Sequence, residues 1–408
     1  MTAARRWTRT VLVGTLLALC PAPGPAQTAD ALFDPDALHE VRLRVNSRDW
    51  TRLQLTYLEN THYPCELLWN GLRIPNAALR SRGAFTRSAL KPGLRIDFTR
   101  YMPDRRFLGL STLVLDNLVQ DPSTAREALA MRLFARLGLP APRVSHTRLY
   151  VNGRYLGVYA IVESIEDTAF LERTLGEHDG VLYEYHWADE WWFDYLGPDL
   201  NAYATRFEPR TRQSDPFEDL YAPIEQLVRT VNEAPDDAFE SSAGALIQLD
   251  AVVTQAAAEN AASDIDGLAG AWGVNNFYLY RRAGSRPAVT IPWDKDTTFS
   301  DADFPATYNL EREVLLRRAL QVHRLRELYL DTLLAAADAL SARDGIPPEG
   351  PTWAEREIEK VYGLVRDALL DDPGRPYTMD EFEAGIEQLR EVVRARPDSL
   401  RREVARLR

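Results

Sequence analysis

The chain has 408 residues, of which 45% are hydrophobic and 10% aromatic, so it is long enough to bury a large core. Its formal net charge of −12 argues against non-specific binding to nucleic acid or to anionic membranes, and it favours a basic or neutral partner. None of the six histidines stands at a metal-ligand spacing from a cysteine or another histidine, so the sequence does not predict a zinc site.

The N-terminal residues have the pattern of a cleavable signal peptide. Arginines at positions 5, 6 and 9 precede an apolar run at residues 11–19, and a small-residue, proline-rich stretch follows at residues 21–29. The apolar run is shorter than the roughly 20 residues that cross a bilayer, and nothing comparable recurs downstream. We therefore expect a signal peptide at residues 1–26, cleaved after Ala26 or alternatively after Ala29. The protein would be exported to the periplasm or the medium without a membrane span.

The two cysteines bear on the same prediction. Cys20 raises the alternative of a lipid anchor, but Leu19 before it is bulkier than a lipoprotein signal accepts. If Cys20 leaves with the signal, Cys65 is the single remaining cysteine, and the exported protein forms no internal disulfide. Its stability then depends on the hydrophobic core.

Residues 27–163 predict a β-rich unit with one principal helix. Strand-like composition and two Asn-Gly pairs indicate strands and type I′ hairpin turns, because Asn and Gly both tolerate positive φ. The expected strands are 39–45, 93–98 and 111–115, and the expected hairpins are 65–80 around Asn70-Gly71 and 148–161 around Asn152-Gly153. A short helix capped by Asn46 or Ser47 follows the first strand. An amphipathic helix at 123–137 begins with Ser/Thr caps and ends at Gly138.

Residues 164–408 predict a mostly helical unit. Helical periodicity indicates helices at 221–232, 243–262, 310–342, 353–371 and 379–394, with a last helix after Pro397. One strand pair, at 277–280 and 288–292, interrupts them. The predicted fold class is therefore α+β: a β-rich N-terminal lobe and a mostly helical C-terminal lobe, which is the outline of a protein-kinase-like fold.

Carboxylates and amides flank the inner strand pair. Asp264 and Asp266 follow a helix, Asn275-Asn276 open the first inner strand, and Asp294 closes the second. A kinase places its catalytic base and two metal-holding side chains in this order, because hard Mg²⁺ takes oxygen ligands. The alternative interpretation of such an acidic loop is a solvated turn.

With these residues the chain resembles the spore-coat CotH kinase family of atypical bacterial protein kinases. The resemblance is carried by segments in the family's order over about residues 35 to 305, and the C-terminal helices also look like the end of the family. The segments are Arg80-Ser-Arg-Gly83, residues 91–98, 126–130, 137–140 and 152–159 leading to Glu163, then residues 265–267, 275–280 and 291–296. The resemblance implies a kinase fold with ATP and Mg²⁺ or Mn²⁺ as cofactors.

The resemblance also assigns site residues. Asp266 matches the catalytic aspartate, with Asp264 as its competitor; the glycine after Asp266 favours Asp266. Asp294 matches the metal-binding aspartate and Asn276 the asparagine that holds a second ion. Asp296 lies two residues beyond Asp294, which on a strand would put both on one face, so it is either a further metal ligand or a loop cap.

The phosphate-binding residues are expected in the N-terminal lobe. Lys91 is one of only three lysines in a chain that otherwise uses arginine, so we expect it to face the cleft and pair with the nucleotide phosphates, with Arg95 as the alternative. Glu127 would then orient Lys91 through an ion pair, or else it only stabilises its helix N-terminus. Arg82-Gly83 would form the nucleotide-covering turn, where glycine lets the backbone approach phosphate.

The chain departs from ordinary protein kinases. It has no Gly-x-Gly-x-x-Gly loop, no His-Arg-Asp and no Asp-Phe-Gly, and Ala84-Phe85 stand where the family more often has a small polar residue. The acidic aromatic stretch at residues 189–195 is either a substrate platform or, as we expect, a loop packed on the C-terminal lobe.

Two classes of function stay open. The resemblance implies a metal-dependent kinase that phosphorylates Ser or Thr hydroxyls of exported or surface proteins, the acceptor being basic if it complements the acidic chain. The alternative is a non-catalytic structural or envelope protein with a pseudokinase fold, which the exported address and Ala84 favour.

Overall fold

The computed structural model describes residues 27–408. The predicted signal peptide and Cys20 lie outside the described residues. No helix in the described part is both long enough and apolar enough to cross a membrane. Cys65 is a buried free thiol, and its burial raises the pKa of that thiol to about 12.

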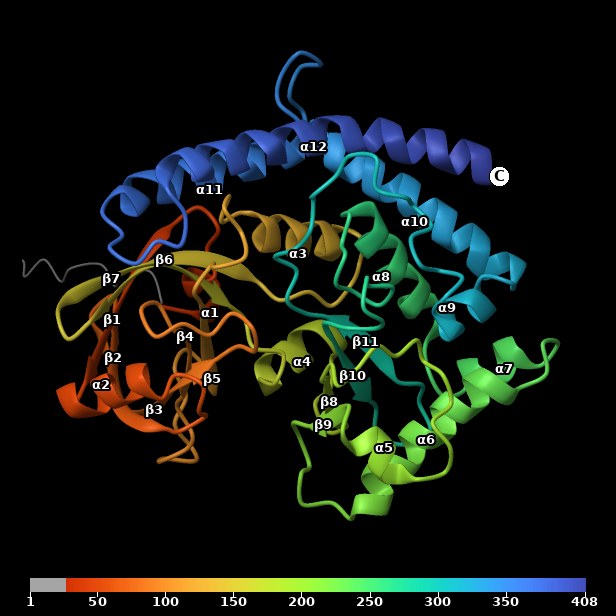
Figure 1. Ribbon diagram of the computed structural model, residues 1–408, viewed down its shortest axis with the longest axis horizontal. Coiled ribbons are helices and arrows are strands. Elements are labelled where there is room, and N and C mark those ends of the chain that lie inside the picture. Colours follow the sequence, from red (N-terminus) through yellow and green to blue (C-terminus); the bar gives the residue numbers. More distant parts are fainter. Residues whose placement is uncertain (1–26) are drawn as a thin grey trace, which may run out of the picture.

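Seven strands near the N-terminus form a closed barrel, seen at the left of Figure 1. Its order is β1-β2-β3-β4-β5-β7-β6, with β1 parallel to β6 and the other neighbours antiparallel. The strands are β1 Leu38–Val45, β2 Tyr63–Trp69, β3 Leu72–Arg82, β4 Gly93–Asp97, β5 Thr112–Asp116, β6 Val144–Val151 and β7 Arg154–Val162. Closure is possible because inward apolar residues alternate along strands such as β1 and fill the interior.

Both predicted hairpins are confirmed. Asn70 and Gly71 have φ of 44° and 79°, and Asn152 and Gly153 have 52° and 82°, so both residues of each turn are in the left-handed region that type I′ requires. The prediction did not include closure, because the parallel β1–β6 pairing joins segments more than a hundred residues apart.

Three helices accompany the barrel: α1 Ala29–Leu32, α2 Ser47–Leu55 and α3 Arg126–Arg136. The predicted Asn46 cap of α2 is confirmed, because its side chain accepts a hydrogen bond from the Arg48 N–H at 2.9 Å. The predicted Ser/Thr cap of α3 is wrong. Asp121 accepts from the Arg126 N–H at 2.9 Å instead, and the helix begins only at Arg126.

A second sheet lies in the C-terminal part. It has the order β11-β10-β8-β9, formed by β8 Val181–Tyr185, β9 Phe207–Pro209, β10 Phe277–Arg281 and β11 Val289–Pro292. The predicted strand pair is β10–β11, but β8 and β9 were missed. Both missed strands are short, and a loop and a short helix lie between them in the chain. Neither strand therefore shows an extended alternation of apolar and polar residues.

Helices make up most of the remainder. They are α4 Thr168–Leu175, α5 Leu200–Ala204, α6 Phe217–Glu233, α7 Phe239–Gly244, α8 Leu249–Ala261, α9 Val314–Ala319, α10 His323–Ser341, α11 Trp353–Leu370 and α12 Met379–Leu407. The single helix predicted at 243–262 is divided, because the backbone between α7 and α8 leaves the helix to pair with Ala288 beside β11. The helix predicted at 310–342 is also divided. The predicted break at Pro397 is wrong, since α12 continues through that residue.

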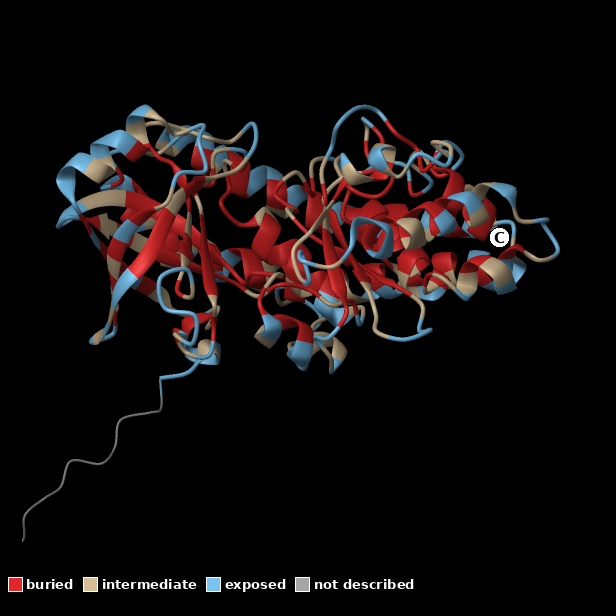
Figure 2. Cartoon of the chain, turned by 90° about the horizontal axis from the view of Figure 1, so that it is seen from below, coloured by how far each residue is buried: buried red, intermediate tan, exposed pale blue. Residues whose placement is uncertain are grey.

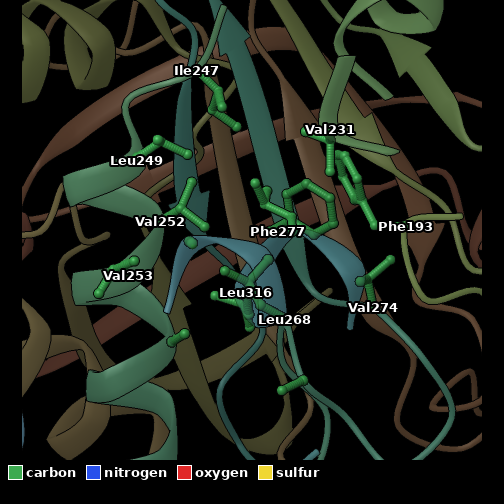
Figure 3. Close-up of a cluster of buried hydrophobic side chains, with 14 of the residues drawn as sticks. Phe193, Val231, Ile247, Leu249, Val252, Val253, Leu268, Val274, Phe277 and Leu316 are labelled. Carbon is green, nitrogen blue, oxygen red and sulfur yellow. The ribbon is translucent and has the colours of Figure 1, made fainter. Parts of the chain in front are cut away.

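The hydrophobic core connects these parts. Almost all of α8 is buried, and Figure 3 shows its Leu249 and Val252 beside Phe277 of β10 in one apolar cluster. Buried residues dominate the strands and central helices in Figure 2. The long helices α11 and α12 run along the top of Figure 1; α11 contacts β6 and β7 of the barrel, and α12 contacts α10. The helix pair therefore ties the barrel to the helical part.

Candidate functional site

A cleft of about 530 Å³ lies between the barrel and the second sheet. This volume is in the range of small-ligand sites. One wall comes from β3, β4 and the loop after β3, and the other from β8, β9 and the residues next to β10 and β11. Its charged and amide side chains are Asn60, Arg80, Arg82, Arg87, Arg95, Gln120, Glu166, Glu184, His186, Glu208, Arg210, Asp266, Asn275, Asn276 and Asp294.

Asn276 and Asp294 are adjacent because β10 and β11 are paired at that end. The antiparallel register places Phe277 opposite Pro292, and the Trp293 N–H donates to the Asn276 carbonyl at 3.1 Å. Asn276 and Asp294 both have left-handed backbone, with φ of 51° and 54°. Asn and Asp are the residues other than glycine that adopt this conformation most readily, so the sequence suits the turns at both ends of the strand pair.

Asp266 faces this pair and is held by two amides. The side-chain N–H groups of Asn275 and Asn276 donate to its two carboxylate oxygens at 2.8 and 2.9 Å. Burial raises the pKa of Asp266, and the two amide hydrogen bonds act against that rise. The carboxylate is therefore oriented at a position that lines the cleft.

Asp264, the competitor of Asp266, is used inside the protein. Its Oδ2 lies 2.8 Å from the Lys295 Nζ, and the same ammonium lies 3.0 Å from a carboxylate oxygen of Glu259. All three side chains are fully or almost fully buried. Asp264 does not line the cleft, so of the two aspartates only Asp266 is placed to meet a ligand there.

Several carboxylates gather behind Asp294. Burial raises the pKa of Asp294 to about 6, although Arg82 opposes the shift, and Asp116 adds to it. Burial and the charge of Asp294 also raise the pKa of Asp296 and of Glu127 well above the usual carboxyl range. Asp296 is nevertheless set back from the cleft surface, where it accepts from Gln120 at 3.2 Å.

This chemistry fits a hard divalent cation. The donor atoms here are oxygens alone, and the charges of the buried Asp294 and Asp296 repel each other, which a bound cation would relieve. Asn276 uses its N–H on Asp266, so its amide oxygen is left as a further ligand for the ion. Asp294 and Asn276 would hold the ion, with Asp296 behind them.

Lys91 is not where the sequence predicted it. Its side chain is 2% exposed, and its Nζ lies 2.8 Å from Asp372 Oδ2 in the loop after α11. Burial lowers the pKa of Lys91, and the charge of Asp372 works against this. Asp372 also accepts from the Val158 N–H of β7 at 2.9 Å. The prediction that Lys91 faces the cleft is wrong, and so is its ion pair with Glu127.

Arginines, rather than Lys91, line the barrel wall of the cleft. Arg82, near the end of β3, pairs with Asp116 of β5 at 2.9 Å, and its charge acts on both Glu127 and Asp294. Gly83 follows with φ of 108°, and a Cβ built there would lie 2.5 Å from the Thr86 hydroxyl oxygen. Arg82 and Gly83 therefore line the cleft at the predicted turn.

Arg95 also lines the cleft, through a bidentate ion pair. Its two terminal nitrogens lie 2.7 and 2.6 Å from the oxygens of Glu166. This fork-to-carboxylate geometry is the strong form of an arginine ion pair. Arg95, the alternative to Lys91, thus reaches the cleft with its charge already matched.

A third group in the cleft was missed by the sequence analysis. Glu184 and His186 of the β8 segment lie beside Glu208 of β9, with ligand atoms within 4.8 Å of one another. Arg210 forms ion pairs with both glutamates, at 2.8 Å for Glu208, so its guanidinium already supplies a positive charge to this cluster. Glu184 and His186 are two residues apart, and residues at that spacing in a strand lie on the same face. This signal could not be used because β8 was not predicted.

The acidic aromatic stretch at 189–195 packs as expected. Trp191 is 3% exposed, and its carbonyl accepts from the Val274 N–H at 2.9 Å. Gly273 lies so close to the Trp191 backbone that a Cβ would be 2.3 Å from the Trp191 carbonyl oxygen. The stretch therefore supports the segment that leads from Asp266 to Asn276.

Comparison with known proteins adds two findings. Residues 79–400 match the protein family described as CotH kinase protein. The chain is also 23% identical over 373 residues to the inner spore coat protein H of Bacillus subtilis (strain 168), covering 88% of this chain and 96% of that protein. The family match includes the end of β3 and every residue of the cleft except Asn60, and so spans both walls of the site.

Proposed function

The chain belongs to the CotH kinase family, and from this we propose that it is an atypical protein kinase that transfers the γ-phosphate of ATP to Ser or Thr hydroxyls. The observation that carries the proposal is the geometry at Asp266, whose carboxylate is oriented by Asn275 and Asn276 next to Asp294. An oriented carboxylate beside an oxygen-only cation site is the arrangement that phosphoryl transfer needs.

Asp266 serves as the general base in this proposal. The acceptor hydroxyl oxygen forms a bond to the γ-phosphorus, the bond from that phosphorus to the β–γ bridging oxygen breaks, and ADP leaves. The hydroxyl proton passes to the Asp266 carboxylate. Its raised pKa suits this role, because a base closer to the operating pH is a better proton acceptor.

Asp294 and Asn276 would hold Mg²⁺ or Mn²⁺, which when bound neutralises phosphate charge. Arg82 lies on the opposite wall, so its guanidinium is placed to contact the phosphates of ATP. Gly83 lets the loop after β3 come close to the same group.

The acceptors are proposed to be exported or surface proteins. The relative is named as an inner spore coat protein, which supports a coat or surface location for this chain. Cleavage of residues 1–26 belongs to the same proposal. It is checked by N-terminal sequencing of secreted protein, which should begin near Gln27 without lipid.

The decisive experiment compares Asp294→Asn with Asp266→Asn. Asp294→Asn should weaken both the thermal shift with ATP and Mg²⁺ or Mn²⁺ and the transfer of label from γ-labelled ATP, since a neutral amide is a poorer cation ligand. Asp266→Asn should bind ATP like the wild type and lower turnover by about 10²–10⁴-fold. Label transfer is measured to Ser-containing proteins and to the enzyme itself.

Asp264→Asn serves as the contrast, because its side chain is in the Lys295 ion pair rather than in the cleft. If it destroys turnover in a folded protein while Asp266→Asn does not, the base is misassigned. A wild type without metal-dependent ATP binding or transfer would instead support the non-catalytic structural protein.

A further inference from the structure

Among the described residues, two arginines of the cleft, Arg80 and Arg87, form no ion pair, and of these only Arg80 has guanidinium nitrogens without a hydrogen bond. Arg95 and Arg210 pair with glutamates, and Arg82 pairs with Asp116. Arg80 forms no ion pair with any carboxylate among the described residues, although it lines the same cleft. Its positive charge is therefore available to a ligand.

The surroundings of Arg80 increase this excess of positive charge. In the β3–β4 register Arg80 stands directly opposite Arg95, and like charges at such positions destabilise a sheet. Burial lowers the pKa of Arg80 to about 10; Arg95, Arg82 and Arg87 add to the effect, and Glu166 opposes it. The guanidinium is still protonated at neutral pH, so the repulsion persists.

The hydrogen bonds of Arg80 leave part of its guanidinium open. Its Nη1 donates to the Asn60 side-chain oxygen at 3.2 Å and to the Ser81 carbonyl at 2.9 Å. Its Nε and Nη2 donate to no described residue. An oxyanion in the cleft could accept from this edge in the paired geometry that arginine prefers.

Arg87 fixes this arrangement without competing for the ligand. Its Nη2 donates to the same Asn60 oxygen at 2.6 Å, and its Nε donates to the Gly83 carbonyl at 2.7 Å. The remaining bonds of Arg87 go to the carbonyls of Tyr57 and Glu59. Arg87 is thus a positioning residue that adds a second positive charge beside Arg80.

The site lies apart from the cation-binding residues. Arg82 is the last residue of β3 and pairs with Asp116 of β5 at 2.9 Å, whereas Arg80 lies two residues earlier on the strand and donates to Asn60. Asn60, the anchor of Arg80, is exposed at the rim. Arg82 is therefore the arginine nearer the donor phosphates, and Arg80 is the one nearer an acceptor that enters from outside.

We propose that Arg80 binds a carboxylate group of the acceptor polypeptide, so that the preferred acceptors carry acidic residues near the target hydroxyl. This inference rests on the proposed kinase function and names its substrate class. It replaces the basic acceptor suggested by the net charge of −12, because the open edge of the Arg80 guanidinium acts at contact distance, whereas charges elsewhere on the chain are screened by salt.

The test uses Arg80→Gln, with Arg73→Gln as the matched control. Arg73 lies on the same strand but is exposed, pairs with Glu66 and is not part of the cleft. The probes are two labelled peptides with one serine, flanked in one by glutamates and in the other by lysines. Binding is followed by fluorescence anisotropy without nucleotide, and phosphorylation with ATP and Mg²⁺.

Wild type should bind and phosphorylate the glutamate peptide in preference to the lysine peptide. Arg80→Gln should weaken binding of the glutamate peptide and raise its KM by about 10-fold or more, with kcat and the ATP thermal shift nearly unchanged. Arg73→Gln should change neither. Arg80→Gln should leave the apo melting temperature nearly unchanged, because Glu166 offsets the repulsion between Arg80 and Arg95, so the loss of peptide binding is not a loss of fold.

The outcomes separate this inference from the proposed function. If wild type prefers the lysine peptide, or binds neither peptide, the acceptor assignment is wrong. Loss of the ATP thermal shift in Arg80→Gln would move Arg80 to the donor phosphates and also overturn it. If wild type binds the glutamate peptide through Arg80 but transfers no phosphate, the anion site stands while the kinase function fails.

Discussion

The two walls of the cleft carry opposite chemistry. The wall from the second sheet presents Asp266, Asn276 and Asp294, while the barrel wall presents Arg80 and Arg82. Each of the two lysines close to the cleft is buried in an ion pair with an aspartate, Lys295 behind the first wall and Lys91 behind the second. The comparison shows that arginines line the cleft, whereas these two lysines are held in buried ion pairs.

Lys295→Ala should have the largest effect on stability. The change leaves two buried carboxylates, Asp264 and Glu259, without their shared cation, and breaking a buried pair in this way costs about 3–5 kcal/mol. Urea denaturation of the variant and wild type measures the loss. An unchanged free energy of unfolding would contradict a structural role for Lys295.

Lys91→Ala should have a smaller but clear effect, because it leaves one buried carboxylate, Asp372, unpaired. Asp372 keeps the Val158 N–H as a partner, so we expect a loss of about 2–4 kcal/mol. The variant that remains folded should still show a thermal shift with ATP and Mg²⁺ or Mn²⁺. This result would replace the expectation that Lys91 pairs with the nucleotide phosphates.

Lys360→Ala is the control for both lysine variants. Lys360 is the third lysine of the chain, is 40% exposed and pairs with Asp36 and Glu357 at the surface. Its replacement should cost about 0–1 kcal/mol. If Lys91→Ala instead behaves like this control in stability but no longer binds ATP, Lys91 is a phosphate ligand and the comparison of the walls fails.

The wall from the second sheet could be predicted because its pattern is local. Asn276 precedes β10 and Asp294 follows β11, so pairing of two neighbouring strands is sufficient to bring them together. The preference for Asp266 over Asp264 rested on the glycine that follows Asp266 in the sequence. The burial of Asp264 against Lys295 became visible only in three dimensions.

The barrel wall was harder to predict because its contacts are distant in sequence. The partner of Lys91 is Asp372, 281 residues further along the chain, and no local pattern indicates that pairing. Lysine is rare in this chain, and this drew attention to Lys91. The rarity of a residue does not show whether it forms a buried ion pair or contacts a ligand. The unpaired state of Arg80 likewise depends on which carboxylates reach Arg82, Arg95 and Arg210.

Gly83→Ala should cost less stability than the change of either buried lysine, and it tests the function of the barrel wall. Its φ of 108° disfavours any side chain, and the new Cβ would lie 2.5 Å from the Thr86 hydroxyl oxygen, so the loop after β3 must shift. We expect a loss of about 1–2 kcal/mol, together with a decrease of about 10-fold in kcat/KM for ATP.

Gly71→Ala is the matched control, because Gly71 has φ of 79° in a hairpin turn with no atom within 4 Å of the added Cβ. It should lose similar stability and keep full activity, as measured by urea denaturation and label transfer. Equal activity in the two variants would show that the turn at Gly83 does not approach the nucleotide, and the phosphate-binding part of the barrel wall would then consist of the arginines alone.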